Sequence, residues 1–476
     1  MTRVPSQHGL FAIFGLLIVF AGLLGAYQGH RYREYLADAW SIPPQDVNLF
    51  KADYWMGELV ESIIERGEYR GCYPSTVSAQ PATVGLCMSA HRMPVVSFFM
   101  ALVAATFNDV VFYQSMKSML SMAMLCMAAW LVLRQTEDWR IVGAGLLLVY
   151  VLCPPNLQIF FGTVTEESYL IPQMALTGAL LFSRRRAEET TSYATLIGLA
   201  VLVAAMPMTK SSAFLPAAVI AVLLALKAYR RSAVFLLPLA ALVVTILGWG
   251  AFTYKATGHF AFGNTLSSLN GYNLHHGYTK YYGEVAPRYH LDVPVWRGQI
   301  TLDAPVRDEW EMNKQFADRS IAFVQDNPRT ALWYLALKTY AALVKLTPEY
   351  RLQSGEDGFF LPKHLILTAG LILDRAVLWL SVAAALSICW QAVRSTGWKS
   401  LIRDDQASDA CMLLLVTFAY LVPFVIAFST YRHLVPLYYF QVPYLASVLL
   451  RSSLLQQSNW GAKLSRLVGR PATANG

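Results

Sequence analysis

Apolar runs long enough to cross a bilayer divide this sequence, and they constrain its fold more than any other feature. Several of these runs exceed the roughly 18 residues that mark a membrane-spanning helix. Charged residues make up only 14% of the chain, well below the roughly 25% of soluble domains. The sequence therefore predicts an all-α polytopic membrane protein with about 10–12 transmembrane helices.

The order of apolar and polar stretches predicts how the chain is organised. The first apolar run lacks a small-residue cleavage site, so we interpret it as a retained helix. The sequence leaves open whether residues 331–372 cross the membrane twice or form interfacial helices. The chain has 12 spans in the first case and 10 in the second. The predicted parts are a first transmembrane helix (1–27), a polar segment with two juxtamembrane helices (28–109), transmembrane helices 2 to 7 (110–253), a second polar segment (254–330), C-terminal membrane helices (331–450) and a tail (451–476).

The distribution of basic residues predicts the orientation of these spans. Lys and Arg gather in the short loops and in the tail, which marks them as cytoplasmic. Both termini are then cytoplasmic, and the two long polar segments lie outside. A P-loop and a GxGxxG motif are absent, so the substrate is not expected to be a cytosolic nucleotide. We therefore expect the chemistry to lie on the outside face and to involve a group carried on a membrane lipid.

An acidic stretch over residues 46–66 follows the first span. From Tyr54 onward its apolar residues form two rows at helical spacing, which predicts an interfacial helix too polar to cross a bilayer. Asp53 lies at the first turn, where a carboxylate is either an N-cap or a general base, and Asp46 is the competing carboxylate. No cofactor is predicted. A divalent ion on Asp46, Asp53 and Glu58 is left open, with sensitivity to EDTA as its test.

Other unusual polar residues fall at the predicted outer ends of the spans. Arg92 precedes a short apolar helix (residues 94–107), and both it and Lys210 either extend toward the interface or contact an anion. Glu166 begins a span, where an acid also favours the helix dipole. Arg432 lies between two apolar runs, where a charge is costly and a lipid phosphate is a suitable partner.

The stretch 264–283 is rich in Asn, Gly and Tyr, which suits either a loop that hydrogen-bonds sugar hydroxyls or a plain turn. Its two histidines are adjacent, so they do not share a helix face as zinc ligands of the HExxH type do. Cys72 and Cys87 lie in the first polar segment. If that segment faces an oxidising compartment they can form a disulfide, although the spacing alone does not establish the pairing.

Taken in order, these segments resemble the bacterial GT-C glycosyltransferases that use polyprenyl-phosphate sugars, a group that includes the lipid A aminoarabinose transferase and the protein O-mannosyltransferases. The resemblance is carried by KADYWMGELVESIIERGEY, HRMPVVSFFMALVAATFND, GTVTEESYLIPQMALTGALL, LVAAMPMTKSSAFLPAAV, SLNGYNLHHG, FVQDNPRTALWYLALKTY and STYRHLVPLYYF. It implies a GT-C type helical bundle with interfacial helices and extracytoplasmic loops.

The resemblance implies an inverting glycosyltransferase that moves a sugar from a polyprenyl phosphate to a hydroxyl of an envelope glycan, lipid or protein. Asp53 would be the base, with Asp46 as the alternative. The implied phosphate ligands are Arg432, Lys210, Arg92 and His433, and the implied sugar or acceptor contacts are Glu166, Asn270, Tyr272, Asn273 and His276. The partners are then the lipid-linked donor, the acceptor and membrane lipids, without nucleic acid. The alternatives are a transporter or flippase of lipid-linked glycans, and an O-antigen ligase-like transferase.

Overall fold

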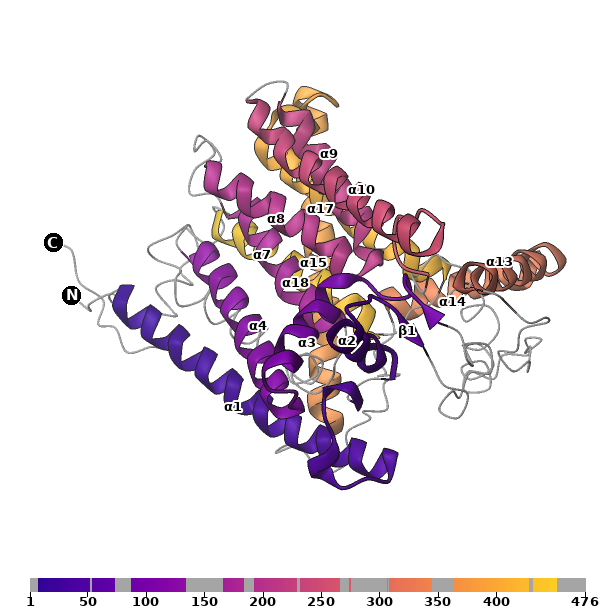
Figure 1. The fold of residues 1–476 in the computed structure, drawn as a ribbon. Helices are drawn as coiled ribbons and strands as arrows, with labels where there is room; N and C mark the ends of the chain where they lie inside the picture. Colours follow the sequence, from indigo (N-terminus) through magenta and orange to yellow (C-terminus); the bar gives the residue numbers. More distant parts are fainter. Residues whose placement is uncertain are drawn as a thin grey trace.

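The computed structural model is a bundle of α-helices with one short hairpin (Figure 1). It describes residues 7–51, 54–72, 87–133, 166–183, 192–228, 232–265, 274, 306, 308–344, 363–427 and 431–451. Within these ranges five helices are long and apolar enough to span a membrane: Phe11–Asp38, Val110–Leu133, Ala233–Thr257, Ile372–Thr396 and Asp405–Ile426. The predicted fold class, an all-α polytopic membrane protein, is therefore confirmed.

The helices of the bundle come from both halves of the chain. The first half contributes α1 (Gln7–Trp40), α4 (Val110–Leu133), α7 (Glu166–Phe182), α8 (Tyr193–Thr209), α9 (Phe214–Ala228) and α10 (Leu237–Thr257). The second half contributes α13 (Glu309–Asp326), α14 (Pro328–Leu343), α15 (Lys363–Thr396), α16 (Ser400–Arg403), α17 (Asp405–Ile426) and α18 (Tyr431–Arg451). Single turns of 3-10 helix cover Ser211–Ala213 and Ala233–Leu236. Residues 134–165, in the part predicted to hold transmembrane helices 2 to 7, lie outside the described residues.

One boundary differs from the sequence-based prediction. The first helix continues through a polar end to Trp40, beyond the predicted limit at residue 27. Of the region 331–372 that the sequence left open, α14 is one short helix and α15 begins at Lys363. In α1 the extra turns are polar, and apolar content alone does not mark the end of a helix that continues beyond the hydrocarbon.

Small residues allow α1 to pack closely along α4, beside which it runs at the edge of the bundle (Figure 1). A methyl group on Gly25 would lie 2.6 Å from the backbone oxygen of Gln114, and one on Gly29 would lie 2.9 Å from the Cα of Val111. Close backbone approach through glycine is a common way for helices to associate in membranes.

The first polar segment folds against the end of α4 instead of crossing the bundle. Two single turns (Pro44–Asp46 and Leu49–Lys51) lead into α2 (Tyr54–Arg66), and the hairpin strands β1 (Gly71–Cys72) and β2 (Cys87–Met88) lead into α3 (Pro94–Thr106). The two predicted juxtamembrane helices are thus present as α2 and α3. Met56, Leu59 and Val60 of α2 are buried, while Ile64 of the predicted second row is exposed. Figure 1 shows α2, α3 and β1 gathered beside one another.

A disulfide between Cys72 and Cys87 closes the hairpin, in which these two residues are also the antiparallel partners. The pairing that the sequence left open is thus present in the structure. Persistent disulfides are typical of oxidising compartments and rare in the cytosol.

The disulfide is expected to contribute measurably to stability. Its sequence separation is 15 residues, and closing a loop of that length constrains the unfolded chain by about 3 kcal/mol. The double substitution Cys72→Ser/Cys87→Ser should therefore lower the thermal midpoint of the detergent-solubilised protein. A reductant should shift the wild-type midpoint in the same direction and leave the double variant unchanged. An equal response of both proteins to reductant would contradict the assignment.

Candidate active site

The centre of the candidate site is a pair of buried acids at the start of α7. Glu166 and Glu167 are 7% and 2% exposed, and both lie in the first turn of the helix. Carboxylates are favoured there by the helix dipole, which gives the pair a structural reason for its position. Burial of two neighbouring carboxylates is costly unless cations compensate their charge.

Lys210 supplies one of these cations. It follows the last residue of α8 in an extended conformation, and its Nζ donates to Glu167 Oε1. The side chains of Lys210 and Glu167 are 11% and 3% exposed, so the ion pair is shielded from solvent. A lysine ammonium carries three donor hydrogens, and this contact uses one of them.

His433 reaches the same carboxylate oxygen from α18. Its Nε2 lies 3.3 Å from Glu167 Oε1. The hydroxyl of Tyr420 in α17 donates to the backbone oxygen of His433 at 2.8 Å, and Phe424 stacks on the imidazole with 5.2 Å between ring centroids. The beginning of α18 is thus fixed on α17. Lys338 of α14 in turn donates to the last carbonyls of α17, those of Ile426 and Ala427.

Arg92 pairs with the second acid. Its Nη1 lies 3.3 Å from Glu166 Oε1, and the side chain of Arg92 is 22% exposed. The hydroxyl of Tyr69 donates to the Arg92 backbone oxygen at 3.0 Å. Tyr69 itself packs edge-on against Trp249 of α10, and burial raises the pKa of this phenol well above its ordinary value. The backbone at Arg92 is therefore held by a rigid aromatic group.

Three predicted phosphate ligands, Arg92, Lys210 and His433, thus converge on Glu166 and Glu167 from separate parts of the chain. The topology prediction had placed these residues at the same ends of their spans, and the ion pairs bring them together. The prediction assigned Glu166 alone to the site, although the sequence places Glu166 and Glu167 together at the start of the span. In the structure Glu167 joins Lys210 to His433.

The other predicted site residues are placed only in part. Asp46 is exposed, at the end of the turn Pro44–Asp46, and Lys51 donates to its backbone oxygen at 3.2 Å. Arg432 belongs to the first turn of α18, next to His433, but its side chain is outside the described parts. The remaining predicted residues also lie outside them: Asp53, Asn270, Tyr272, Asn273 and His276. In the ranges that the structure describes, no group of three or more His, Cys, Asp or Glu side chains is arranged to hold a metal ion.

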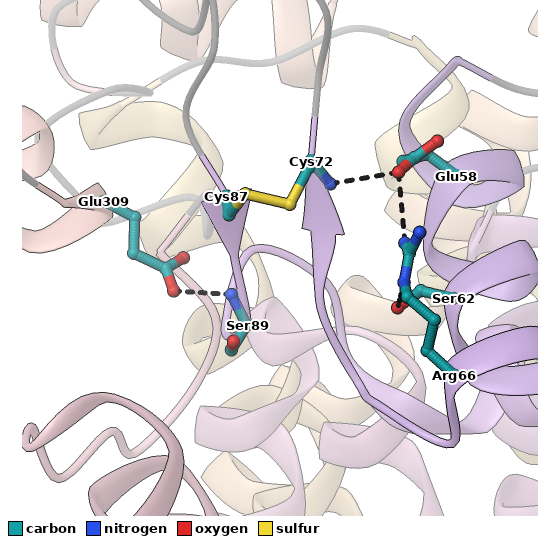
Figure 2. Close-up of a disulfide and its surroundings, with 7 residues drawn as sticks. All are labelled: Glu58, Ser62, Arg66, Cys72, Cys87, Ser89 and Glu309. Carbon is teal, nitrogen blue, oxygen red and sulfur yellow. Dashed lines mark hydrogen bonds and ion pairs between the residues drawn. A yellow bond between two sulfur atoms is a disulfide. The ribbon is translucent and has the colours of Figure 1, made fainter.

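A second buried acid, Glu309, lies close to the disulfide and was not predicted. Figure 2 shows Glu309 on one side of the hairpin and Glu58 on the other. Glu58 accepts from the backbone N–H of Cys72 at 3.4 Å and pairs with Arg66 at 3.3 Å, so it ties α2 to β1. Glu309 accepts from the N–H of Ser89 at 2.8 Å, just after β2. No local pattern in the sequence indicates this contact between residues 220 positions apart.

Buried charges within the apolar helices were also overlooked. Lys117 of α4 and the neighbours Asp374 and Arg375 of α15 are all at most 7% exposed. Arg375 donates to the hydroxyl of Tyr438 in α18. A charge inside a predicted span is itself a signal, because such a side chain requires polar surroundings. These residues lie inside the bundle.

No protein-family model matches the chain, and no curated protein matches it. Among solved structures, the chain is similar to the archaeal oligosaccharyltransferase AglB from Archaeoglobus fulgidus, solved with an inhibitory peptide and a dolichol-phosphate. The likeness has a TM-score of 0.45 and 12% identity, and it covers 97% of this chain and 52% of AglB. The chain thus spans about half the length of that protein. Since so low a score does not establish common function, the function proposed below rests on the residues of this chain.

Proposed function

We propose that this protein is an inverting glycosyltransferase of the GT-C type that transfers a sugar from a polyprenyl phosphate to an acceptor hydroxyl. The observation that carries the proposal is the convergence of Arg92, Lys210 and His433 on the acid pair of α7, each at or next to one end of a helix. Guanidinium and ammonium groups are the usual protein ligands of phosphate, and their position beside apolar helices suits a phosphate that carries a lipid tail.

The acid pair has a role in this proposal. In the absence of donor, Glu166 and Glu167 balance the charge of Arg92 and Lys210 and hold both side chains in place. A polyprenyl-phosphate sugar is a phosphodiester with one negative charge. As the sugar leaves, a second negative charge develops on the phosphate, and preorganised cations stabilise it in the transition state.

The reaction then requires one base. Asp53 accepts the proton of the acceptor hydroxyl, the acceptor oxygen forms a bond to the anomeric carbon, and the bond from that carbon to the phosphate oxygen breaks. The polyprenyl phosphate departs with the electron pair. A phosphate leaves without protonation, so the acid partner that glycosidases employ is not needed, and a single displacement inverts the anomeric centre. Asp46 is the alternative base.

The proposed location is the periplasmic face of a bacterial inner membrane, with both termini in the cytoplasm. The distribution of basic residues supports this orientation. The Cys72–Cys87 disulfide supports it independently, because it lies in the segment that the same rule assigns to the outside. The acceptor would be an envelope glycan, lipid or protein. The loop that contains Asn270, Tyr272, Asn273 and His276 would contact the sugar or the acceptor.

Analysis of bound lipid tests the proposed donor class. Protein purified in mild detergent should retain polyprenyl monophosphate or its mono-sugar derivative, detectable by mass spectrometry of the extracted lipid. The purified protein should release polyprenyl phosphate from a synthetic polyprenyl-phosphate sugar in the presence of an acceptor extract. Retention of a diphosphate-linked glycan instead would indicate a ligase-like transferase. Movement of intact lipid-linked glycan across vesicles without transfer would indicate a flippase. Either result would overturn the proposal.

A further inference from the structure

Glu309 is a buried acid outside the candidate site whose two carboxylate oxygens both accept hydrogen bonds. It lies in the first turn of α13 and is 2% exposed. Its Oε1 accepts from the N–H groups of Ser89 and Ala90 at 2.8 and 2.9 Å, and its Oε2 accepts from the hydroxyl of Thr265 at 2.8 Å. Burial raises the pKa of Glu309, while these same three donors oppose the shift. A carboxylate with three donors is thus the link between α13, the end of β2 and residue 265.

The turn over residues 261–265 follows α10 and is held in place by several hydrogen bonds. The N–H of Thr265 donates to the backbone oxygen of Ala90 at 2.8 Å, and the indole of Trp249 donates to the backbone oxygen of Gly263 at 3.0 Å. The hydroxyl of Ser211 donates to Asn264 Oδ1 at 3.1 Å. A side chain at position 263 would meet the Cβ of Ser211 at 3.0 Å, so the turn lies directly against the residue that follows Lys210.

This turn therefore joins the two cation-bearing segments. On one side it contacts Ala90, two residues before Arg92. On the other it contacts Ser211, the residue after Lys210. The ion pairs of Arg92 and Lys210 then lead to adjacent residues, Glu166 and Glu167. The segments that carry the two cations are thus linked through α7 on one side and through the 261–265 turn on the other.

We propose that Glu309 is a positioning residue that fixes the spacing of Arg92 and Lys210 by clamping the 261–265 turn to the segment after β2. The inference rests on the proposed function, because it assigns these cations to the donor phosphate. Among the residues that the structure describes, Glu309 contacts neither cation directly. It acts through the backbone that carries the two cations. A displacement of a catalytic or binding group by about 1 Å can reduce the rate by up to the order of 100-fold.

Glu309→Ala tests the clamp in two independent ways. Hydrogen–deuterium exchange should become faster at Ser89 and Ala90, whose N–H groups lose their acceptor, and this readout requires no donor. In transfer assays the KM for polyprenyl-phosphate sugar should rise on the order of 10-fold or more, while the KM for acceptor stays near the wild-type value. Glu309→Gln keeps an acceptor oxygen for the two N–H groups and should recover most of both losses.

Matched controls separate the clamp from general damage to α13. Asp318→Ala removes an exposed acid from the same helix and should leave exchange and both KM values unchanged. Thr265→Val removes one of the three donors and should give an intermediate effect; it replaces Glu309→Ala if that variant does not fold.

The experiments test the proposed function and the role of Glu309 separately. Wild-type protein that neither binds nor turns over the lipid donor would refute the proposed function, while the exchange experiment still reports on the clamp. Active wild-type protein with an unchanged donor KM in Glu309→Ala would overturn the positioning role. Unchanged exchange at Ser89 and Ala90 would overturn the clamp itself.

Discussion

Lys210→Met should destabilise the protein and abolish efficient use of the lipid donor. The substitution keeps the length of the side chain but leaves Glu167, whose side chain is 3% exposed, without the ammonium that pairs with it. Removing one partner of a buried ion pair typically costs about 3–5 kcal/mol, because the remaining charge stays buried. His433, at 3.3 Å from the same carboxylate oxygen, is expected to reduce this loss. Thermal unfolding in detergent measures the effect on stability.

The double substitution Lys210→Met/Glu167→Gln separates stability from function. With both charges removed, no buried charge is left uncompensated, and most of the lost stability should return. Transfer should remain low, because the cation proposed to face the phosphate is still absent. Lys255→Met, an exposed lysine in the last turn of α10, is the matched control and should behave like wild type. Recovery of transfer in the double variant would contradict the assignment of Lys210 to the donor.

Asp53→Asn should reduce transfer by about 10²–10⁴-fold, the range that a general base contributes. Asparagine caps a helix about as well as aspartate, so the substitution removes the base and keeps a cap. Stability and retention of the lipid donor should therefore be unchanged. Initial rates with saturating donor and acceptor measure the effect.

Asp46→Asn is the paired control for that experiment. Asp46 is exposed at the end of its turn, and its substitution should leave the rate near the wild-type value. A large loss in Asp46→Asn with full activity in Asp53→Asn would make Asp46 the base. Full activity in both variants would show that neither aspartate is the general base.

The sequence predicted best the elements that periodicity and turn chemistry determine locally. α4 begins at Val110, where the sequence predicted transmembrane helices 2 to 7 to begin, directly after Asn108 and Asp109. The short helix after Pro94 was also predicted, since its length alone excludes a full crossing. The polar end of α1 was missed, because polar helical turns outside a membrane lack the apolar signal used to find spans.

The candidate site was predicted as a set of residues but not as a set of contacts. Arg92, Lys210 and His433 were selected because charges at the ends of spans need a reason. Nothing local indicates that Lys210 and His433 share Glu167, or that Glu309 binds the backbone of Ser89. Such partners are brought together only when helices far apart in the chain pack against each other.

The close packing of α7 against α18 has a consequence for biosynthesis. A methyl group on Gly178 of α7 would lie 3.4 Å from the Cα of Phe440 in α18, so the two backbones are nearly in contact. Ribosomes deliver α7 and α8 to the membrane well before α18. During that interval Glu167 depends on Lys210, which lies at the end of the next described helix, for its counter-charge. We expect α7 and α8 to insert as a hairpin in which Lys210 neutralises Glu167, before α18 brings His433 to the same carboxylate.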